Sequence, residues 1–96
     1  MVHYGFEWDE KKARLNEEKH GVTFDEATSC FGDVFAIESF DVDHSAAEDR
    51  FALIGMSEKK RIVVVAFTLR DGNTIRVISA RQATRKERKE YEEQTP

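Results

Sequence analysis

The sequence predicts a single α+β domain in which an antiparallel β-sheet of about four long strands follows two N-terminal helices and precedes one C-terminal helix. Three observations support this prediction. Helix-capping residues stand near both ends of the chain, hydrophobic residues in the middle follow the strand period of two, and the connections between these runs are short. Strands joined by short connections are antiparallel neighbours, because parallel pairing needs a long crossover. We expect one domain over residues 1–96.

Two capping patterns predict the N-terminal helices. Asp9 is an N-cap candidate for a first helix, and Gly21 can adopt the left-handed conformation that ends it. Thr23 and Glu26 have the spacing of a capping box, which predicts a second helix over residues 24–31. The N-terminal third of the chain is therefore expected to be helical.

Four runs rich in β-branched and other apolar residues predict the strands, and they cover residues 34–40, 50–56, 61–68 and 74–81. The third run is apolar on both faces, which indicates a central strand. Asp71-Gly72 is a hairpin signal between the last two runs. Thr84 and Glu87 form a second capping box, which opens a helix of about ten residues. The residues expected in the core are Phe51, Val64, Phe67, Val77 and Ile78.

The composition excludes several classes of protein. The chain is 40% hydrophobic and 35% charged, which is typical of a globular and not a disordered chain. No apolar run approaches the roughly 20 residues of a membrane span, and no secretory signal is present, so we expect a cytoplasmic protein without a membrane partner. The lone Cys30 fits a reducing compartment and a core position. His3, His20 and His44 are too scattered to predict a metal site, and no cofactor is expected.

Charge is unevenly distributed along the chain. The net charge is −4, but residues 1–49 contain 4 basic and 13 acidic side chains, whereas residues 50–96 contain 11 basic and 6 acidic ones. This asymmetry predicts a basic surface for an anionic partner. The alternative is that folding brings the two halves together, so that the charges pair in space.

The arginines of the second half could support cleavage of RNA without a metal. The ribose 2′-oxygen attacks the adjacent phosphorus, arginine binds the phosphate oxygens, and a histidine, glutamate or tyrosine moves protons. We expect Arg81, at a strand end, to face a cleft without being fully paired to a carboxylate. Because Arg76 and Arg81 are an odd number of residues apart, an ideal strand places them on opposite faces.

Two alternative interpretations concern neighbouring residues. Arg85, Arg88 and Lys89 are better explained by ion pairs with glutamates of the same helix, at a spacing of four residues. His44 and Ser45 stand near Glu48, but neighbouring loop positions do not form a catalytic triad, so a serine hydrolase is not predicted.

Three groups of residues, in order along nearly the whole chain, form a recognisable pattern. The first contains Phe6-Glu7-Trp8-Asp9-Glu10, Lys12, Asn16, Lys19-His20-Gly21-Val22, Phe24 and Glu26-Ala27. The second contains Asp43-His44-Ser45, Glu48, Arg50-Phe51 and Gly55. The third contains Val64-Val65-Ala66-Phe67-Thr68, Ile75-Arg76-Val77-Ile78-Ser79-Ala80-Arg81, Ala83, Glu87-Arg88 and Tyr91. Together they resemble the BrnT toxin family.

The resemblance implies a RelE-like fold and an endoribonuclease toxin of a type II toxin–antitoxin system. It implies RNA as the substrate and a BrnA-type antitoxin as the neutralising partner. Operator DNA would be contacted only through that antitoxin. Dimerised toxin–antitoxin assemblies occur in such systems, so a homo-oligomer is compatible with the resemblance.

The candidate catalytic residues are, in descending order, Arg81, Arg50, Lys19, His20, Glu48 and Tyr91. The two arginines would bind phosphate or transition-state charge, the pair ending the first helix would contact RNA or the antitoxin, and the last two would transfer protons. Asn16 and Trp8 are expected to organise the first helix. The antitoxin is expected on the basic half, near the two arginines and the terminal helix.

The alternative function is a non-catalytic module that binds protein or nucleic acid. A nuclease requires basic and proton-transferring groups that converge on one concavity of about phosphate size. Scattered arginines paired with carboxylates would instead favour the binding module.

Overall fold

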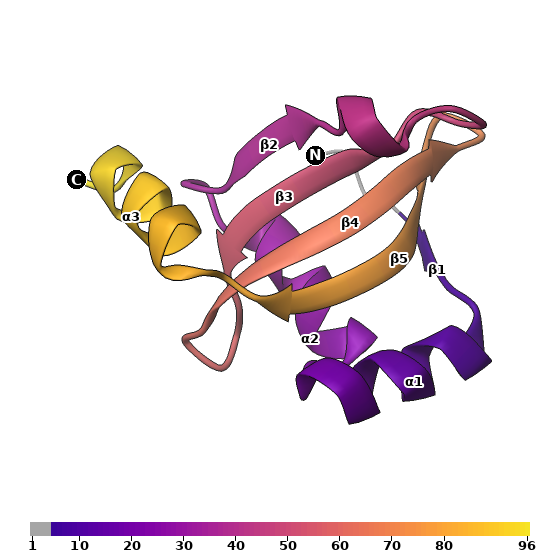
Figure 1. Ribbon diagram of the computed structural model, residues 1–96, viewed down its shortest axis with the longest axis horizontal. Helices are drawn as coiled ribbons and strands as arrows, with labels where there is room; N and C mark the ends of the chain where they lie inside the picture. The colour runs from indigo at the N-terminus through magenta and orange to yellow at the C-terminus, as the bar shows by residue number, and fades with distance from the viewer. Residues whose placement is uncertain (1–4) are drawn as a thin grey trace.

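The computed structural model, described here for residues 5–96, contains one five-stranded mixed sheet with the strand order β1-β5-β4-β3-β2 (Figure 1). The strands are β1 (Gly5–Glu7), β2 (Ile37–Phe40), β3 (Phe51–Met56), β4 (Ile62–Arg70) and β5 (Thr74–Gln82). The helices are α1 (Glu10–His20), α2 (Phe24–Ser29) and α3 (Arg85–Gln94), with short 3₁₀ helices at Cys30–Gly32 and Val42–His44. No helix in this part of the chain is long and apolar enough to cross a membrane.

The expected antiparallel strands are present, but a fifth strand makes the sheet mixed. β1 pairs in parallel with the start of β5, Gly5 opposite Thr74, and its three residues are too few to show a period of two. β2 begins later than the predicted run 34–40, because the Asp33 carboxylate accepts the Phe35 N–H and turns the chain. The predicted helix over residues 24–31 ends earlier and continues as a 3₁₀ turn. His3 lies outside the described residues.

Capping explains where the helices begin and end. The Asp9 carboxylate accepts the Lys12 N–H at 3.0 Å, and Gly21 ends α1 with φ of 69°. At α3, both hydrogen bonds of the Thr84–Glu87 capping box are formed. These predicted boundaries are confirmed, because short-range hydrogen bonds alone determine them.

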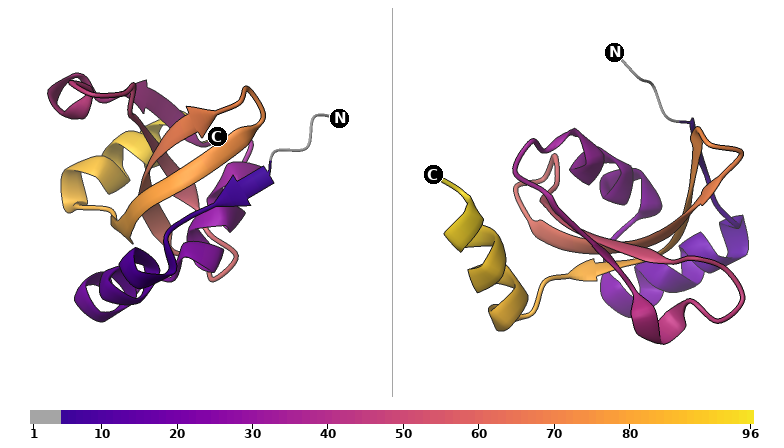
Figure 2. Two further views of the ribbon diagram at one scale, coloured as in Figure 1. Left: turned by 90° about the vertical axis from the view of Figure 1, so that its right-hand side faces the viewer. Right: turned by 90° about the horizontal axis from the view of Figure 1, so that it is seen from above.

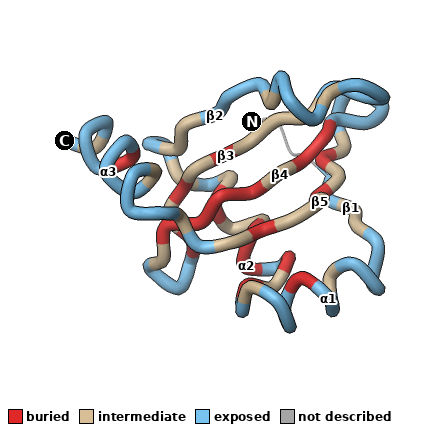
Figure 3. Tube along the Cα trace, in the orientation of Figure 1, coloured by how far each residue is buried: buried red, intermediate tan, exposed pale blue. Residues whose placement is uncertain are grey.

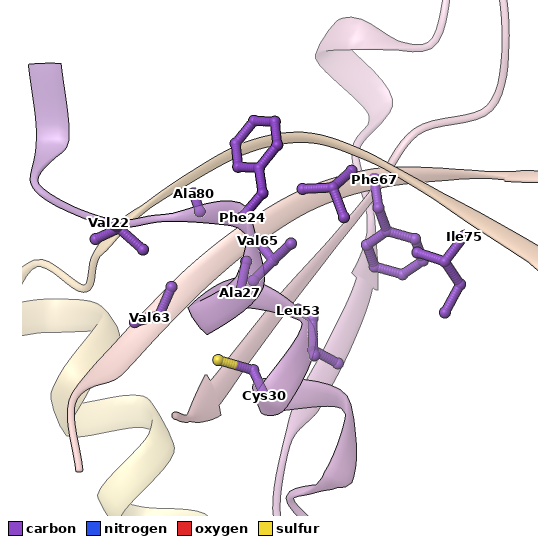
Figure 4. Packing of buried hydrophobic residues seen from close by; sticks show 11 residues of the cluster. Val22, Phe24, Ala27, Cys30, Leu53, Val63, Val65, Phe67, Ile75 and Ala80 are labelled. Carbon is purple, nitrogen blue, oxygen red and sulfur yellow. The ribbon is translucent and has the colours of Figure 1, made fainter. Parts of the chain in front are cut away.

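The hydrophobic core lies between the sheet and the helices α1 and α2 (Figures 2 and 4). Its members are Val22, Phe24, Ala27, Cys30, Leu53, Val63, Val65, Phe67, Ile75, Val77 and Ala80. Of the expected core residues, Phe51 packs against this cluster, Val64 is buried on the opposite face and Ile78 is only half-buried. Burial raises the pKa of the Cys30 thiol to about 12, so this thiol is a packing group.

A β-bulge at Ile78 changes the face to which β5 side chains point. Ser79 pairs with Ala66 of β4, and Val77 pairs with the next residue, Phe67, so Ile78 has no partner position. An extra residue reverses the alternation of side chains beyond it. The first half of β5 therefore contributes to the core at odd-numbered positions, and the second half contributes at an even-numbered one.

The bulge corrects the expected positions of two arginines. Arg76 pairs with Thr68 and Arg81 pairs with Val64, and both β4 residues lie on the face away from α1 and α2. Arg76 and Arg81 consequently share one face, although their odd spacing predicted opposite faces. The same change buries Ala80 in the core.

The sheet face opposite α1 and α2 is open. In Figure 1 this face is turned toward the viewer, with α3 beside one end of the strands and the 3₁₀ helix Val42–His44 beside the other. Figure 3 shows buried and half-buried residues along β3, β4 and β5, and Val64 and Thr68 are buried residues of this face. An open, partly apolar sheet face flanked by polar segments is suited to binding a ligand.

Candidate functional site

A cavity of about 270 Å³ lies on the open face of the sheet. The residues that line it are Asp41, His44, Arg50, Ala52, Val64, Ala66, Ser79 and Arg81. The small side chains of β3 and β4 leave room above the strands, while charged side chains stand around the rim. The cavity thus combines an apolar floor with cationic walls.

Arg81 reaches this cavity because of the bulge in β5. Its Nη1 and Nη2 donate hydrogen bonds to the two carboxylate oxygens of Glu87, at 2.7 and 2.9 Å. Arg81 therefore faces a concavity, as expected, but it is paired with a carboxylate, contrary to expectation. The pair is end-on, so the Nε–H edge of the guanidinium makes no hydrogen bond with the described residues. An arginine has five N–H donors, so this edge can donate hydrogen bonds to a bound anion.

The ion pair strongly affects the acid–base behaviour of Glu87. The hydrogen bond from Arg81 is the main reason that the pKa of Glu87 falls to about 2, while burial opposes the change. The same hydrogen bond raises the pKa of Arg81. Both groups are charged at neutral pH, and Glu87 holds the arginine in one orientation.

Arg50, immediately before β3, lines the same cavity. It makes no ion pair within residues 5–96. Its backbone closes the preceding loop, because its N–H donates to Ser45 Oγ at 3.0 Å and its carbonyl accepts the Asp41 N–H at 2.8 Å. The loop therefore holds Arg50 at the rim, with its charge available to a ligand.

His44 and Asp41 form a pair at the same rim. His44 Nδ1 lies 3.0 Å from Asp41 Oδ2 and 3.2 Å from Oδ1. A carboxylate at Nδ1 leaves Nε2 as the free nitrogen. Ser45 and Glu48 are the polar neighbours that follow His44 in sequence, but its partner is the residue three positions earlier. The 3₁₀ turn Val42–His44 brings the two side chains together, so the Asp-x-x-His spacing was a usable signal.

The remaining candidate catalytic residues lie elsewhere. Lys19 and His20 stand at the end of α1 and line a separate hollow. Glu48 lies 3.5 Å from Arg70 and is absent from the cavity lining. Tyr91 is buried and donates its O–H to Asp33, and burial is the first cause that raises its pKa to about 12. The structure brings together two of the six candidates, Arg50 and Arg81.

A family model described as "Ribonuclease toxin, BrnT, of type II toxin-antitoxin system" matches residues 8–87. The chain belongs to the BrnT family. Its fold is similar to the 1.1 Å crystal structure of the Brucella abortus ribonuclease toxin BrnT, with a TM-score of 0.60 and 25% sequence identity. That similarity covers 88% of this chain and 100% of the Brucella chain. No curated protein matches the chain. As a type II family member, the chain is expected to have an antitoxin partner.

In this folded BrnT-family chain, some basic residues of the second half form ion pairs with acidic residues of the first half. The pairs Arg61–Glu26, Arg70–Glu48 and Arg76–Glu7 each join a basic residue of the second half to an acidic residue of the first. The alternative interpretation of the charge asymmetry therefore holds for these three arginines. The predicted pairs of Arg85, Arg88 and Lys89 with glutamates of α3 are not seen in the described part of the chain. These three cations are exposed on α3, which lies beside one end of the open face (Figure 1). Together with Arg50 at the cavity, they are called the basic border of the open face.

Sequence reasoning missed one buried polar cluster. Glu26 is fully buried, and Arg61 Nε donates to it at 2.9 Å while Ser57 Oγ donates at 2.7 Å. The hydrogen bond from Arg61 is the main cause that lowers the pKa of Glu26. The partners are more than 30 residues apart in sequence, so no local pattern reveals them. The cluster joins α2 to the β3–β4 turn and supports the fold away from the cavity.

Proposed function

We propose that this chain is an endoribonuclease that cleaves RNA in the cavity on the open face of its sheet. The observation that carries the proposal is that two arginines and the His44–Asp41 pair line one cavity. This convergence favours a nuclease over a non-catalytic binding module. The BrnT family is described as a ribonuclease toxin, which supports the reaction class.

The arginines would bind the phosphate that reacts. Arg50 and Arg81 both line the cavity, where Arg50 and the free edge of Arg81 would hold the non-bridging phosphate oxygens. Charge on these oxygens grows as the 2′-oxygen attacks, and a fixed guanidinium stabilises that charge most in the transition state. Glu87 keeps Arg81 oriented in this arrangement and is a positioning residue.

His44 would carry the proton transfer. Its Nε2 accepts the 2′-hydroxyl proton as the O2′–P bond forms and the P–O5′ bond breaks, and solvent protonates the departing O5′. The products are a 2′,3′-cyclic phosphate and a 5′-hydroxyl. Asp41 positions the ring and stabilises the imidazolium, as a carboxylate does beside a catalytic histidine. The histidine then releases its proton to solvent.

This reaction would need no metal or cofactor, because the arginines supply the positive charge. Among residues 5–96, no three His, Cys, Asp or Glu side chains are grouped so that they could hold a metal ion. Glu48 and Tyr91, two weaker candidates for proton transfer, have partners outside the cavity, which favours structural roles for both. The RNA substrate implies action in the cytoplasm.

A BrnA-type antitoxin would inhibit the enzyme by covering the open face. The uncovered strands offer apolar contacts, and Arg50 with the cations of α3 offers complementary charge. An acidic or amphipathic segment seated there would exclude RNA. Operator DNA would be bound by the antitoxin, and a larger toxin–antitoxin assembly would form through it.

Cleavage of end-labelled RNA by the purified chain in excess EDTA tests the proposal. We expect wild-type protein to produce cyclic-phosphate ends. Arg81→Ala, Arg50→Ala and His44→Gln should each lower kcat/KM about 10²–10³-fold with the fold retained. Lys59→Ala, which removes an exposed cation in the β3–β4 turn, is the matched control and should cleave normally. Full activity in the three cavity variants would refute the assignment, and inhibition by EDTA would refute the metal-free reaction.

A further inference from the structure

A second hollow borders the cavity along β5. It has a volume of about 240 Å³ and is lined by Lys12, Leu15, Asn16, Lys19, His20, Ile78 and Ser79. Ser79 also lines the cavity that contains Arg50 and Arg81. The two hollows therefore meet at one residue of the strand, and a flexible chain bound in one can continue into the other.

The helical periodicity of α1 places four of the residues that line this hollow on one side of the helix. Residues 12, 15, 16 and 19 of α1 lie three or four positions apart, so they form one stripe on the helix surface. Within the stripe, Asn16 turns inward and binds the Ala80 backbone at 2.8 and 3.1 Å. The hydrogen bonds hold the stripe against the edge of β5. Lys12 and Lys19 are left on either side of Leu15.

The chemistry of the hollow suits a nucleotide. Lys12 and Lys19 are exposed and make no ion pair with any residue in 5–96. Between them, the Leu15 side chain is 55% exposed, and with Ile78 it forms an apolar floor. Single-stranded RNA presents phosphates at a regular spacing together with flat apolar base faces. Cations flanking an apolar floor complement both features.

We infer that this hollow is a second RNA-binding subsite, which holds the nucleotide next to the one cleaved. The inference rests on the proposed function. Lys12 and Lys19 bind backbone phosphate, and Leu15 with Ile78 contacts the base. His20 at the end of α1 adds a donor to the same nucleotide. The candidates Lys19 and His20 thus act in binding, outside the reacting centre.

Oligonucleotides of two lengths test this inference. The probes are a dinucleotide and an octanucleotide of RNA with 2′-O-methyl groups, which block cleavage. The dinucleotide occupies the cavity alone, whereas the octanucleotide also reaches the hollow. Binding is measured by fluorescence anisotropy at several salt concentrations, for the wild type, for Lys12→Ala/Lys19→Ala and for Lys11→Ala. Lys11 is an exposed neighbour on α1 that does not line the hollow.

We expect the double variant to bind the octanucleotide at least about tenfold more weakly than the wild type. Its plot of log affinity against log salt should be shallower by about 1.4, since each phosphate contact on a single strand contributes about 0.7. Dinucleotide binding should be unchanged in this variant, while KM for a cleavable octanucleotide should rise. Lys11→Ala should behave as the wild type.

Three outcomes would overturn the inference and leave the proposed function intact. An unchanged salt dependence in the double variant would show that the lysines do not contact phosphate. An equal loss for dinucleotide and octanucleotide would place them at the cavity itself. Normal RNA binding with weakened antitoxin binding would make the hollow a protein-docking surface. If the wild type neither binds nor cleaves either RNA, the proposed function fails first, and the subsite fails with it.

Discussion

Replacing Glu87 with glutamine isolates the charge of the Arg81–Glu87 pair. The substitution keeps the side-chain length, and the amide oxygen can still accept the Thr84 N–H, so the capping box survives. The pKa of Glu87 falls from 4.5 to about 2, which sets an upper limit of about 3 kcal/mol on the contribution of the pair to the free energy of unfolding. The Arg81 side chain is 42% exposed, and water screens such a pair. We therefore expect Glu87→Gln to lower stability by about 1 kcal/mol at pH 7.

The pH dependence identifies the cause of this loss. A carboxylate whose pKa is lowered on folding contributes stability above its unfolded pKa, and the contribution disappears as pH falls through the folded pKa. The difference between wild type and Glu87→Gln should be constant above about pH 5 and should vanish near pH 2. Urea denaturation followed by Trp8 fluorescence measures it. Glu90→Gln, an exposed substitution on the same helix, is the control and should show no difference.

The same variant tests whether Glu87 positions Arg81 for catalysis. We expect kcat for RNA to fall about tenfold in Glu87→Gln, less than in Arg81→Ala, because the guanidinium remains but is no longer held. A stability difference that is the same at pH 3 and pH 7 would refute the ion-pair argument. A kcat equal to wild type, with the loss of stability confirmed, would show that orientation of Arg81 by Glu87 does not matter for the reaction.

Three further predictions concern packing, a buried polar contact and the partner. A Cβ on Gly55 would lie 3.1 Å from the Cys30 carbonyl oxygen. Gly55→Ala should therefore lower the free energy of unfolding by about 1–3 kcal/mol and lower the Tm measured by calorimetry. An unchanged Tm would mean that the backbone shifts freely. The Asn16 side-chain N–H₂ donates to the carbonyl oxygens of Val22 and Ala80, so Asn16→Asp places a carboxylate beside both oxygens. Asn16→Asp should unfold at lower urea than Asn16→Ala at pH 7 but not at pH 3, and the reverse order would contradict the hydrogen-bond assignment. Antitoxin association measured by stopped flow should slow from low to moderate salt while dissociation changes less, and a rate indifferent to salt would argue against the basic border as the docking site.

Local signals in the sequence predicted much of the fold. The caps at Asp9, Gly21 and Thr84 act within a few residues, so they could be located without knowledge of the rest of the chain. The alternating runs located the β2–β5 strands for the same reason. β1 was missed because three residues show no period, and because its pairing with Thr74 joins distant parts of the chain. Such pairing depends on the assembled sheet.

The candidate site was less accessible to sequence reasoning. Arg50 and Arg81 were proposed as site residues from their residue type and from the resemblance of the sequence to the BrnT family. The structure places both at one cavity. Their convergence depends on the bulge at Ile78, which counting along an ideal strand cannot foresee. Neither His44 nor Asp41 was among the candidates. Their spacing was available in the sequence, but only the 3₁₀ turn Val42–His44 shows that the two side chains meet. The positions of Arg81 and His44 in the site thus depend on a β-bulge and a 3₁₀ turn. The fold depends mainly on regular strands and helices, which leave local patterns in the sequence.

The Asn16 side chain also affects the exposed edge of the sheet. β1 covers only the first three residues of β5, and the rest of that edge would otherwise present free N–H and C=O groups. Such an edge can recruit a strand from another molecule and lead to aggregation. Asn16 satisfies both backbone groups of Ala80, and α1 lies where an incoming strand would have to pair. The amide thus allows β5, which lines the candidate cavity, to lie close to the margin of the sheet without becoming a template for self-association.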